Sequence, residues 1–180
     1  VTLTDGKSQM LVASYNGKVV RFPEDTVRPM GRTATGVRAI KLDEDGKDCV
    51  VGMICVEEGS KDTVLVISDK GYGKRTMLDD ETGEPIYRIT NRGGKGVKTM
   101  NITDKTGNLI GMEAVNDEQD LMLITKSGTA IRMPMTSISI LGRATQGVKL
   151  IELQKRNDTL MFGCTVPKEE VEEQTLDEVT

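Results

Sequence analysis

TNRGGKGVKTMNI, the stretch at residues 90–102, is one of three related copies in the chain. The other two are GRTATGVRAIKL at 31–42 and GRATQGVKLIEL at 142–153. In each copy a glycine follows an arginine by four positions, and the pairs are Arg32/Gly36, Arg92/Gly96 and Arg143/Gly147. Self-similarity at a regular spacing is the sequence signature of repeat folds, so the copies indicate a structural unit that occurs three times.

Two further blocks repeat in the same order around this one. The preceding block has an apolar start, a turn that ends in glycine and an arginine four residues later: LVASYNGKVVRF at 11–22, LVISDKGYGKRT at 65–76 and LITKSGTAIRM at 123–133. The following block is CVVGMICV at 49–56, LIGMEAV at 109–115 and LMFGCTV at 160–166. The turn glycines Gly17, Gly71 and Gly128 set a period of 54 and then 57 residues.

Each unit has the composition of β-strands. Asn16-Gly17 between two runs rich in β-formers is a strong hairpin signal. A second hairpin is expected around Gly46, between the blocks at 31–42 and 49–56, with counterparts at Gly107 and Asn157-Asp158. About four strands per unit, with little helical periodicity, predict an all-β fold: a propeller-like array of about three four-stranded blades in an open arc.

The repeats also predict the domain boundaries. The blades are expected at 1–59, 60–117 and 118–166, followed by an acidic C-terminal tail at 167–180 that is expected to be disordered. Gly71 and Gly96 are 25 residues apart, whereas the equivalent spacing in the other two units is 19. The extra residues lie in DDETGEPIYRI, so the middle unit carries the longer loop, and long loops on a rigid scaffold often carry function.

Composition argues against several classes of protein. The chain has no histidine, so it lacks the commonest general base and the usual zinc ligand. Three cysteines in 180 residues are an odd, sparse set that is typical of a reduced, intracellular protein. No apolar run approaches the roughly 18 residues that a membrane span needs. A chain that begins at Val1 rather than at Met is expected to be part of a longer protein.

Charge is distributed unevenly. The net charge is −4, but residues 167–180 alone carry −5, which leaves +1 for residues 1–166. A near-neutral body with local basic loops is compatible with binding to a polyanion, and an acidic tail is then expected to compete for the same surface.

Motifs for nucleotide and metal binding are absent from the basic loops. The phosphate-binding P-loop requires glycine before its Lys-Thr pair, and Val97 stands at that place before Lys98. In GYGKRT the first glycine of the motif would fall at Ser68. The acidic turn DEDG at 43–46 lacks the first aspartate of a calcium loop.

The phosphate backbone of a nucleic acid fits the middle copy better. Gly93, Gly94 and Gly96 remove Cβ atoms, so main-chain N–H groups can approach an anion closely. Arg92, Lys95 and Lys98 add charge, and arginine offers a two-pronged donor to phosphate. Few aromatic residues are available for stacking on single strands, so the expected target is the backbone of duplex DNA, bound without base specificity.

Other cations in the repeated blocks are further candidates for DNA contact. They are Arg32, Arg38, Arg143 and Lys149 in the glycine blocks, and Arg21, Lys74, Arg75 and Arg132 in the hairpin blocks. For Gly36, Gly96 and Gly147 a role limited to turning the chain stays open beside phosphate contact. For Arg32 and Arg143 a purely structural role also stays open. For Arg21, Arg75 and Arg132, cross-strand pairing inside the sheet is equally compatible with the pattern.

Three segments resemble a known family. GKVVRFPEDTVRPMGRTATGVRAIKL at 17–42, GYGKRT at 71–76 and SISILGRATQGVKLI at 137–151 are similar to the C-terminal domain of the A subunit of bacterial DNA gyrase, and the related subunit of topoisomerase IV is the nearest alternative. The family's characteristic box is Q-[RK]-R-G-G-[RK]-G. Residues 92–96 match its last five positions, but Thr90 and Asn91 replace its glutamine and first basic residue, so this copy is interpreted as a degenerate internal one.

The resemblance implies a fold and a function. The fold is a β-pinwheel of about six four-stranded blades, of which this chain resembles the last three and the tail, and DNA wraps around its basic outer rim in support of negative supercoiling. The chain itself is expected to have no catalytic site and no cofactor, because strand cleavage, ATP and Mg²⁺ belong to other domains of the parent topoisomerase. Expected partners are duplex DNA, the gyrase B subunit and the rest of the gyrase A subunit, in the bacterial cytoplasm at the nucleoid, with no membrane or small-molecule substrate. A protein–protein interaction propeller and a nucleotide-binding enzyme are the alternative functions.

Overall fold

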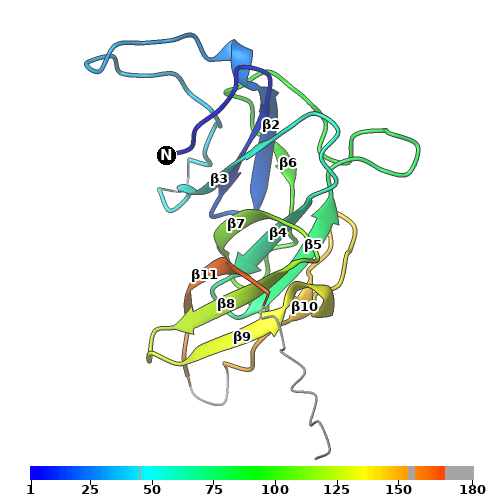
Figure 1. Ribbon diagram of the computed structural model, residues 1–180. Helices are drawn as coiled ribbons and strands as arrows, with labels where there is room; N and C mark the ends of the chain where they lie inside the picture. Colours follow the sequence, from blue (N-terminus) through cyan, green and yellow to red (C-terminus); the bar gives the residue numbers. More distant parts are fainter. Residues whose placement is uncertain (45, 154–156, 169–180) are drawn as a thin grey trace, which may run out of the picture.

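The computed structural model describes residues 1–44, 46–153 and 157–168. Most of the predicted acidic tail, residues 169–180, lies outside the described residues. Three antiparallel sheets follow one another along the long axis of the molecule, and they do not close into a ring (Figure 1). The predicted all-β array with an open arrangement is confirmed.

The strands of each sheet have the following order. The first sheet is β3 (Val50–Val56), β1 (Gln9–Ser14), β2 (Lys18–Pro23) and β6 (Val97–Lys98). The second is β10 (Val148–Lys149), β5 (Tyr72–Met77), β4 (Thr63–Ser68) and β7 (Leu109–Val115). The third is β11 (Leu160–Pro167), β8 (Gln119–Thr125) and β9 (Ala130–Pro134). Short 3₁₀ turns, η1 (Glu24–Thr26) and η2 (Met135–Ser137), follow β2 and β9.

The hairpin predicted in the first block of each unit is confirmed. Gly17 lies in the left-handed region at φ +79°, and its N–H donates to the carbonyl of Ser14 at 2.9 Å. Gly71 and Gly128 close the β4–β5 and β8–β9 turns in the same way, at 3.1 and 3.0 Å. Glycine adopts this conformation without the steric cost that a Cβ atom imposes, which accounts for its recurrence at the turn.

The second hairpin, expected around Gly46, is wrong. Strand β3 pairs with β1, and the block before it does not pair with β3. Instead, the glycine blocks of the second and third units join the sheet of the preceding unit, with Val97 opposite Val19 and Val148 opposite Gly73. The blocks thereby cover an edge that would otherwise expose unpaired backbone groups. Each of the first two sheets therefore takes its fourth strand from the next unit.

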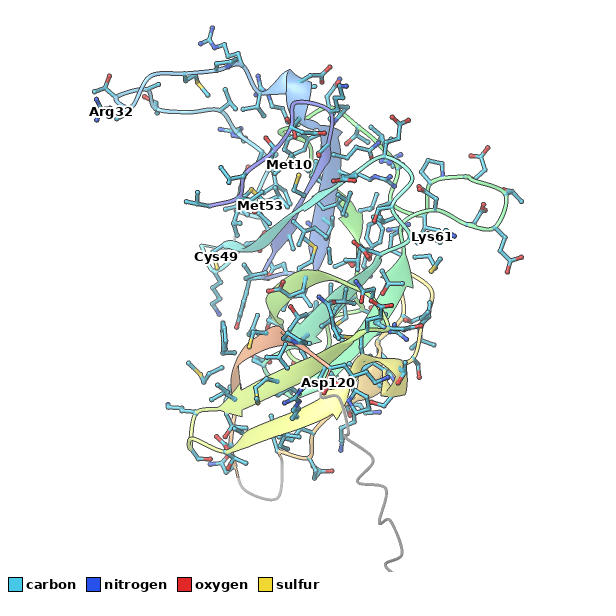
Figure 2. The ribbon with its side chains drawn as sticks, viewed as in Figure 1. Met10, Arg32, Cys49, Met53, Lys61 and Asp120 are labelled. Atoms are coloured by element: carbon cyan, nitrogen blue, oxygen red, sulfur yellow. The ribbon has the colours of Figure 1, made fainter. Side chains whose placement is uncertain are left out.

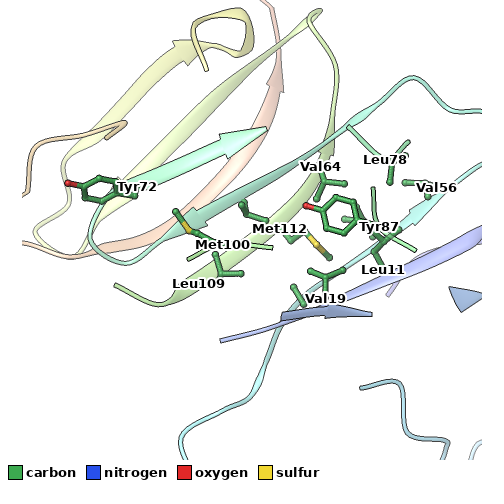
Figure 3. Close-up of a cluster of buried hydrophobic side chains, with 13 residues drawn as sticks. Leu11, Val19, Val56, Val64, Tyr72, Leu78, Tyr87, Met100, Leu109 and Met112 are labelled. Atoms are coloured by element: carbon green, nitrogen blue, oxygen red, sulfur yellow. The ribbon is translucent and has the colours of Figure 1, made fainter. Parts of the chain in front are cut away.

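Apolar residues alternate between the two faces of the strands and so fill two intersheet cores. Leu11 of the first sheet and Val64 of the second sheet belong to one core, together with Tyr87 and Met100 (Figure 3). Leu65 points to the opposite face and packs with the third sheet. Strand β4 is consequently buried along its whole length, because a period of two places successive side chains on opposite faces.

The described residues contain neither a membrane-spanning helix nor a metal-binding cluster. In residues 1–44, 46–153 and 157–168, no helix has the length and apolar character of a membrane span. The same residues contain no group of three or more Cys, Asp or Glu side chains arranged to hold a metal ion.

Candidate nucleic-acid interface

The three glycine blocks lie next to one another in the folded chain. The N–H of Lys41, in the first block, donates to the carbonyl of Gly94 in the second at 2.8 Å. The N–H of Asn101, in the second block, donates to the carbonyl of Thr145 in the third at 3.0 Å. Both contacts join the same positions of consecutive units, so the blocks form one continuous row that we call the basic ladder, residues 37–41, 92–101 and 143–149.

Several of the predicted cations project from this ladder. The guanidinium of Arg92 donates to the carbonyl of Thr26 at 3.1 Å, and that of Arg143 donates to the carbonyl of Lys98 at 2.6 Å. Lys95 and Lys98 are exposed. Over the described part of the chain no carboxylate pairs with Arg38, Arg92, Lys95, Lys98 or Arg143. The positive charge of these side chains is therefore available to an external anion.

Lys149 and Arg32 differ from this group. The ammonium of Lys149 lies 2.7 Å from the Glu152 carboxylate, and this hydrogen bond raises the pKa of Lys149. Both side chains of the pair are substantially exposed, so solvent screens their attraction and a phosphate can compete for the lysine. Arg32 lies on a loop that projects from the body of the molecule, at some remove from the ladder (Figure 2).

The glycines of the middle copy have specific structural roles. The N–H of Gly93 donates to the carbonyl of Ala39 at 2.6 Å, so this donor is already engaged. A Cβ atom at Gly96 would lie 2.5 Å from the carbonyl oxygen of Val19, so this glycine permits the close approach of β6 to β2. Gly94 is exposed, and its carbonyl forms the contact with the first unit.

Lys74 was predicted to contact DNA, but it does not lie on the surface. Its side chain is fully buried, and its ammonium donates to the carbonyls of Gly142 and Arg143 at 2.6 and 2.5 Å and to the hydroxyl of Thr145 at 3.0 Å. Burial, and secondarily the charge of Arg143, lower its pKa from 10.5 to about 8. Direct contact with DNA is excluded for this lysine, because the loop above it covers the charged group.

Arg21 and Arg75 are also buried, and they join consecutive units rather than facing solvent. Arg21 donates to the carbonyls of Leu78 and Tyr87 at 3.2 and 3.1 Å and pairs with Asp79 at 2.8 Å. Arg75 donates to the carbonyl of Ile138, the position equivalent to Tyr87 in the next unit. Both arginines therefore act as clamps between units, which the strand pattern alone did not indicate.

Arg132 occupies the same position in the third unit, where the described residues provide no further unit to clamp. It is exposed, and it pairs with Asp120 on the neighbouring strand β8 at 2.8 Å and donates to the carbonyl of Pro167. The cross-strand alternative therefore holds for this arginine.

Two exposed cations near the ladder were missed. Arg88, in the longer loop of the middle unit, lines a hollow of about 280 Å³ together with Lys95 and Gly94. The extra length of that loop was the sequence feature that could have identified Arg88 as a candidate. Lys105 lies 5.9 Å from the ring centre of Tyr72, which Lys149 also approaches at 6.0 Å. No pattern in its turn distinguished Lys105 from other solvated lysines.

Comparisons with known proteins agree with this architecture. The sequence profile described as "DNA gyrase C-terminal domain, beta-propeller" matches residues 9–57, 62–80, 87–116 and 119–162. The DNA gyrase A subunit of Staphylococcus aureus strain MRSA252 is 44% identical over 178 residues, which is 99% of this chain and 19% of that protein. Its counterpart in strain NCTC 8325 is 44% identical over 175 residues. The chain thus spans about a fifth of the length of these curated relatives.

Solved structures support the same fold. A DNA gyrase A C-terminal domain superposes with a TM-score of 0.76 at 24% identity, over 90% of this chain and 52% of that one. The C-terminal domain of a DNA topoisomerase IV superposes with a TM-score of 0.81 at 20% identity, over 92% of this chain and 49% of that one. The fold is accordingly the β-pinwheel of these domains. Because the profile matches most of the chain, the protein belongs to the DNA gyrase C-terminal domain family.

Proposed function

We propose that the chain binds and bends duplex DNA through its phosphate backbone, without base specificity and without catalysis. The observation that carries the proposal is the basic ladder, in which equivalent backbone hydrogen bonds bring the glycine blocks of three units into one row. A row of cations that recurs with the structural repeat can face the regularly spaced phosphates of DNA. Basic side chains scattered over the surface could not align with these phosphates in the same way.

The mechanism is electrostatic. Each phosphate neutralised by Lys or Arg releases condensed counterions, and this release supplies most of the affinity of proteins that bind DNA without sequence preference. Smooth bending of 20–30 base pairs costs about 1–6 kcal/mol, which several such contacts offset. Arg92 and Arg143 are held by backbone carbonyls at one end, so their guanidinium groups lose less conformational freedom when a phosphate binds.

The parent protein follows from the relatives. We infer that the chain is part of a gyrase A subunit, because the curated relatives at 44% identity carry that name. In such a parent the bent DNA would serve negative supercoiling, with cleavage, ATP and Mg²⁺ handled by other regions and by the B subunit. The bacterial cytoplasm is the corresponding location.

A paired charge reversal tests DNA binding. Arg92→Glu with Lys95→Glu is expected to weaken binding to a duplex of any sequence by at least about tenfold. It is also expected to reduce the slope of log affinity against log salt by roughly 0.9 for each phosphate that is no longer neutralised. The matched control is Lys61→Glu with Lys126→Glu, which changes the charge equally at two exposed sites outside the ladder. Equal weakening by both pairs would show that net charge, and not the ladder, determines binding.

A further inference from the structure

Lys74 is a buried cation in a position that the fold does not require to be charged. In the first unit the equivalent residue, three positions after the turn glycine, is Val20, which is buried in the same kind of strand. Burying an ammonium costs free energy unless its donors are satisfied, whereas burying valine is favourable. The second sheet therefore retains a cation where the first sheet uses an apolar residue.

The ammonium of Lys74 finds its three acceptors in one loop, residues 142–147. The carbonyls of Gly142 and Arg143 and the hydroxyl of Thr145 turn inward to the ammonium. In a trans peptide the N–H points opposite to the C=O, and the described residues contain no cis peptide. The N–H groups of Arg143 and Ala144 therefore point away from Lys74, toward the exposed side of the loop.

These two N–H groups have no protein acceptor among the described residues. Adjacent outward N–H groups in a turn form a concavity that favours anions. The guanidinium of Arg143 lies at the same loop and is fixed by its hydrogen bond to the carbonyl of Lys98. Donors from the backbone and from a charged side chain are thus gathered on residues 143 and 144.

The corresponding loop of the second unit lacks this arrangement. There the N–H of Gly93, equivalent to Ala144, is already bonded to the carbonyl of Ala39, and the sheet beneath provides Val20. The loop at 142–147 is therefore distinct from its neighbour in the ladder, although both carry the arginine.

We propose that loop 142–147 is a phosphate subsite for the DNA backbone and that Lys74 is its positioning residue. The inference rests on the proposed function. The buried ammonium holds two inward carbonyls of this turn against the second sheet, so that the N–H groups of Arg143 and Ala144 face one phosphate oxygen while the Arg143 guanidinium contacts another. Lys74 acts through the loop and does not touch the DNA.

The test uses the 180-residue chain and a short blunt-ended duplex. Lys74→Met is expected to weaken binding about tenfold at low salt and to reduce the salt slope by roughly 0.9, the signature of one phosphate fewer in the complex. Arg143→Ala is expected to give a similar reduction in affinity. The double variant should bind only slightly more weakly than either single one, because the two residues serve one subsite. A purely structural role for Lys74 would leave the salt slope unchanged.

Two further measurements keep the test decisive if Lys74→Met fails to fold. Thr145→Val removes one of the three acceptors of the ammonium and leaves the two carbonyls in place, and we expect about twofold to threefold weaker binding by a chain that still folds. In the wild-type chain, added duplex should shift the NMR amide signals of Arg143 and Ala144. Unshifted signals would overturn the subsite, as would a folded Lys74→Met chain with the wild-type salt slope. Absence of any binding by the wild-type chain would instead refute the proposed function itself.

Discussion

Loops 31–36 and 142–147 have the same local structure in different surroundings. Both read G-R-x-x-x-G, and in both the N–H of the fourth residue donates to the carbonyl of the first: Ala34 to Gly31 at 3.0 Å and Thr145 to Gly142 at 3.3 Å. The loop at 142–147 rests on the second sheet, above Lys74. The loop at 31–36 projects from the body, and a Cβ atom at Gly36 would meet no atom within 4 Å.

The comparison separates the contribution of the local sequence, which forms the turn, from that of the preceding sheet, which positions the loop. The turn forms in both places, so the local sequence is sufficient for it. The placement of the loop depends on the preceding sheet, which the described residues provide for the third unit and not for the first. Substitutions at equivalent positions should therefore have unequal effects, and the size of the inequality measures what the underlying sheet contributes.

The largest difference is expected at the final glycine. At Gly147, where φ is +78°, a Cβ atom would lie 2.8 Å from the carbonyl oxygen of Gly73. Gly147→Ala should lower the free energy of unfolding by about 3 kcal/mol, from left-handed strain together with the clash. Gly36→Ala should cost only about 1 kcal/mol, from strain alone. Denaturant titration of both variants measures the two free energies of unfolding. Equal decreases would mean that the second sheet does not constrain the loop at 142–147.

A smaller difference is expected between the clamp arginines. Arg75→Met leaves the buried carbonyl of Ile138 without its donor, at a cost of about 2 kcal/mol. Asp120 is buried, so Arg132→Met is made together with Asp120→Asn, which removes the whole pair without leaving a buried carboxylate unpaired and should cost less than about 1 kcal/mol. Thermal unfolding of the two variants provides the measurement. A larger loss for the double variant at Arg132 and Asp120 than for Arg75→Met would contradict the role of Arg75 as a clamp between units.

The smallest effect is the response of the two loops to pH. The pKa of Lys74 is about 8 in the folded chain and 10.5 ordinarily, so the unfolded chain binds more protons between these values. Stability should therefore rise with pH in that window, by about 1 kcal/mol between pH 7 and pH 9, and Lys74→Met should abolish this gain. In NMR titrations the methyl signal of Ala144 should move with a midpoint near 8, whereas that of Ala34 should stay constant. A parallel movement of both signals would assign the change to another group.

The sequence predicted the local features well. The turn glycines, the repeated strands and the open three-sheet array depend on short-range patterns, which glycine spacing and alternating apolar residues reveal. For Gly96, the glycine spacing identified a position that has no room for a side chain, because a Cβ atom there would lie 2.5 Å from the carbonyl oxygen of Val19.

Features that depend on contacts between units were not predictable in the same way. Strands β6 and β10 are two residues long, too short to carry a pairing signal, and their partners lie in the preceding unit. Lys74 looks like any surface lysine in GYGKRT until the stacking of the third unit is known. Arg21 finds its carbonyl acceptors 57 and 66 residues away, a distance that no local pattern conveys.

The borrowing of a strand from the following unit has a consequence for synthesis on the ribosome. Residues 72–77 leave the exit tunnel long before residues 148–149, with which they pair. During translation the most recently synthesised sheet therefore has an unpaired edge strand until the next repeat has emerged. Each sheet can be completed only after the following repeat has been synthesised. Chaperones that shield such edges would act most usefully at that stage.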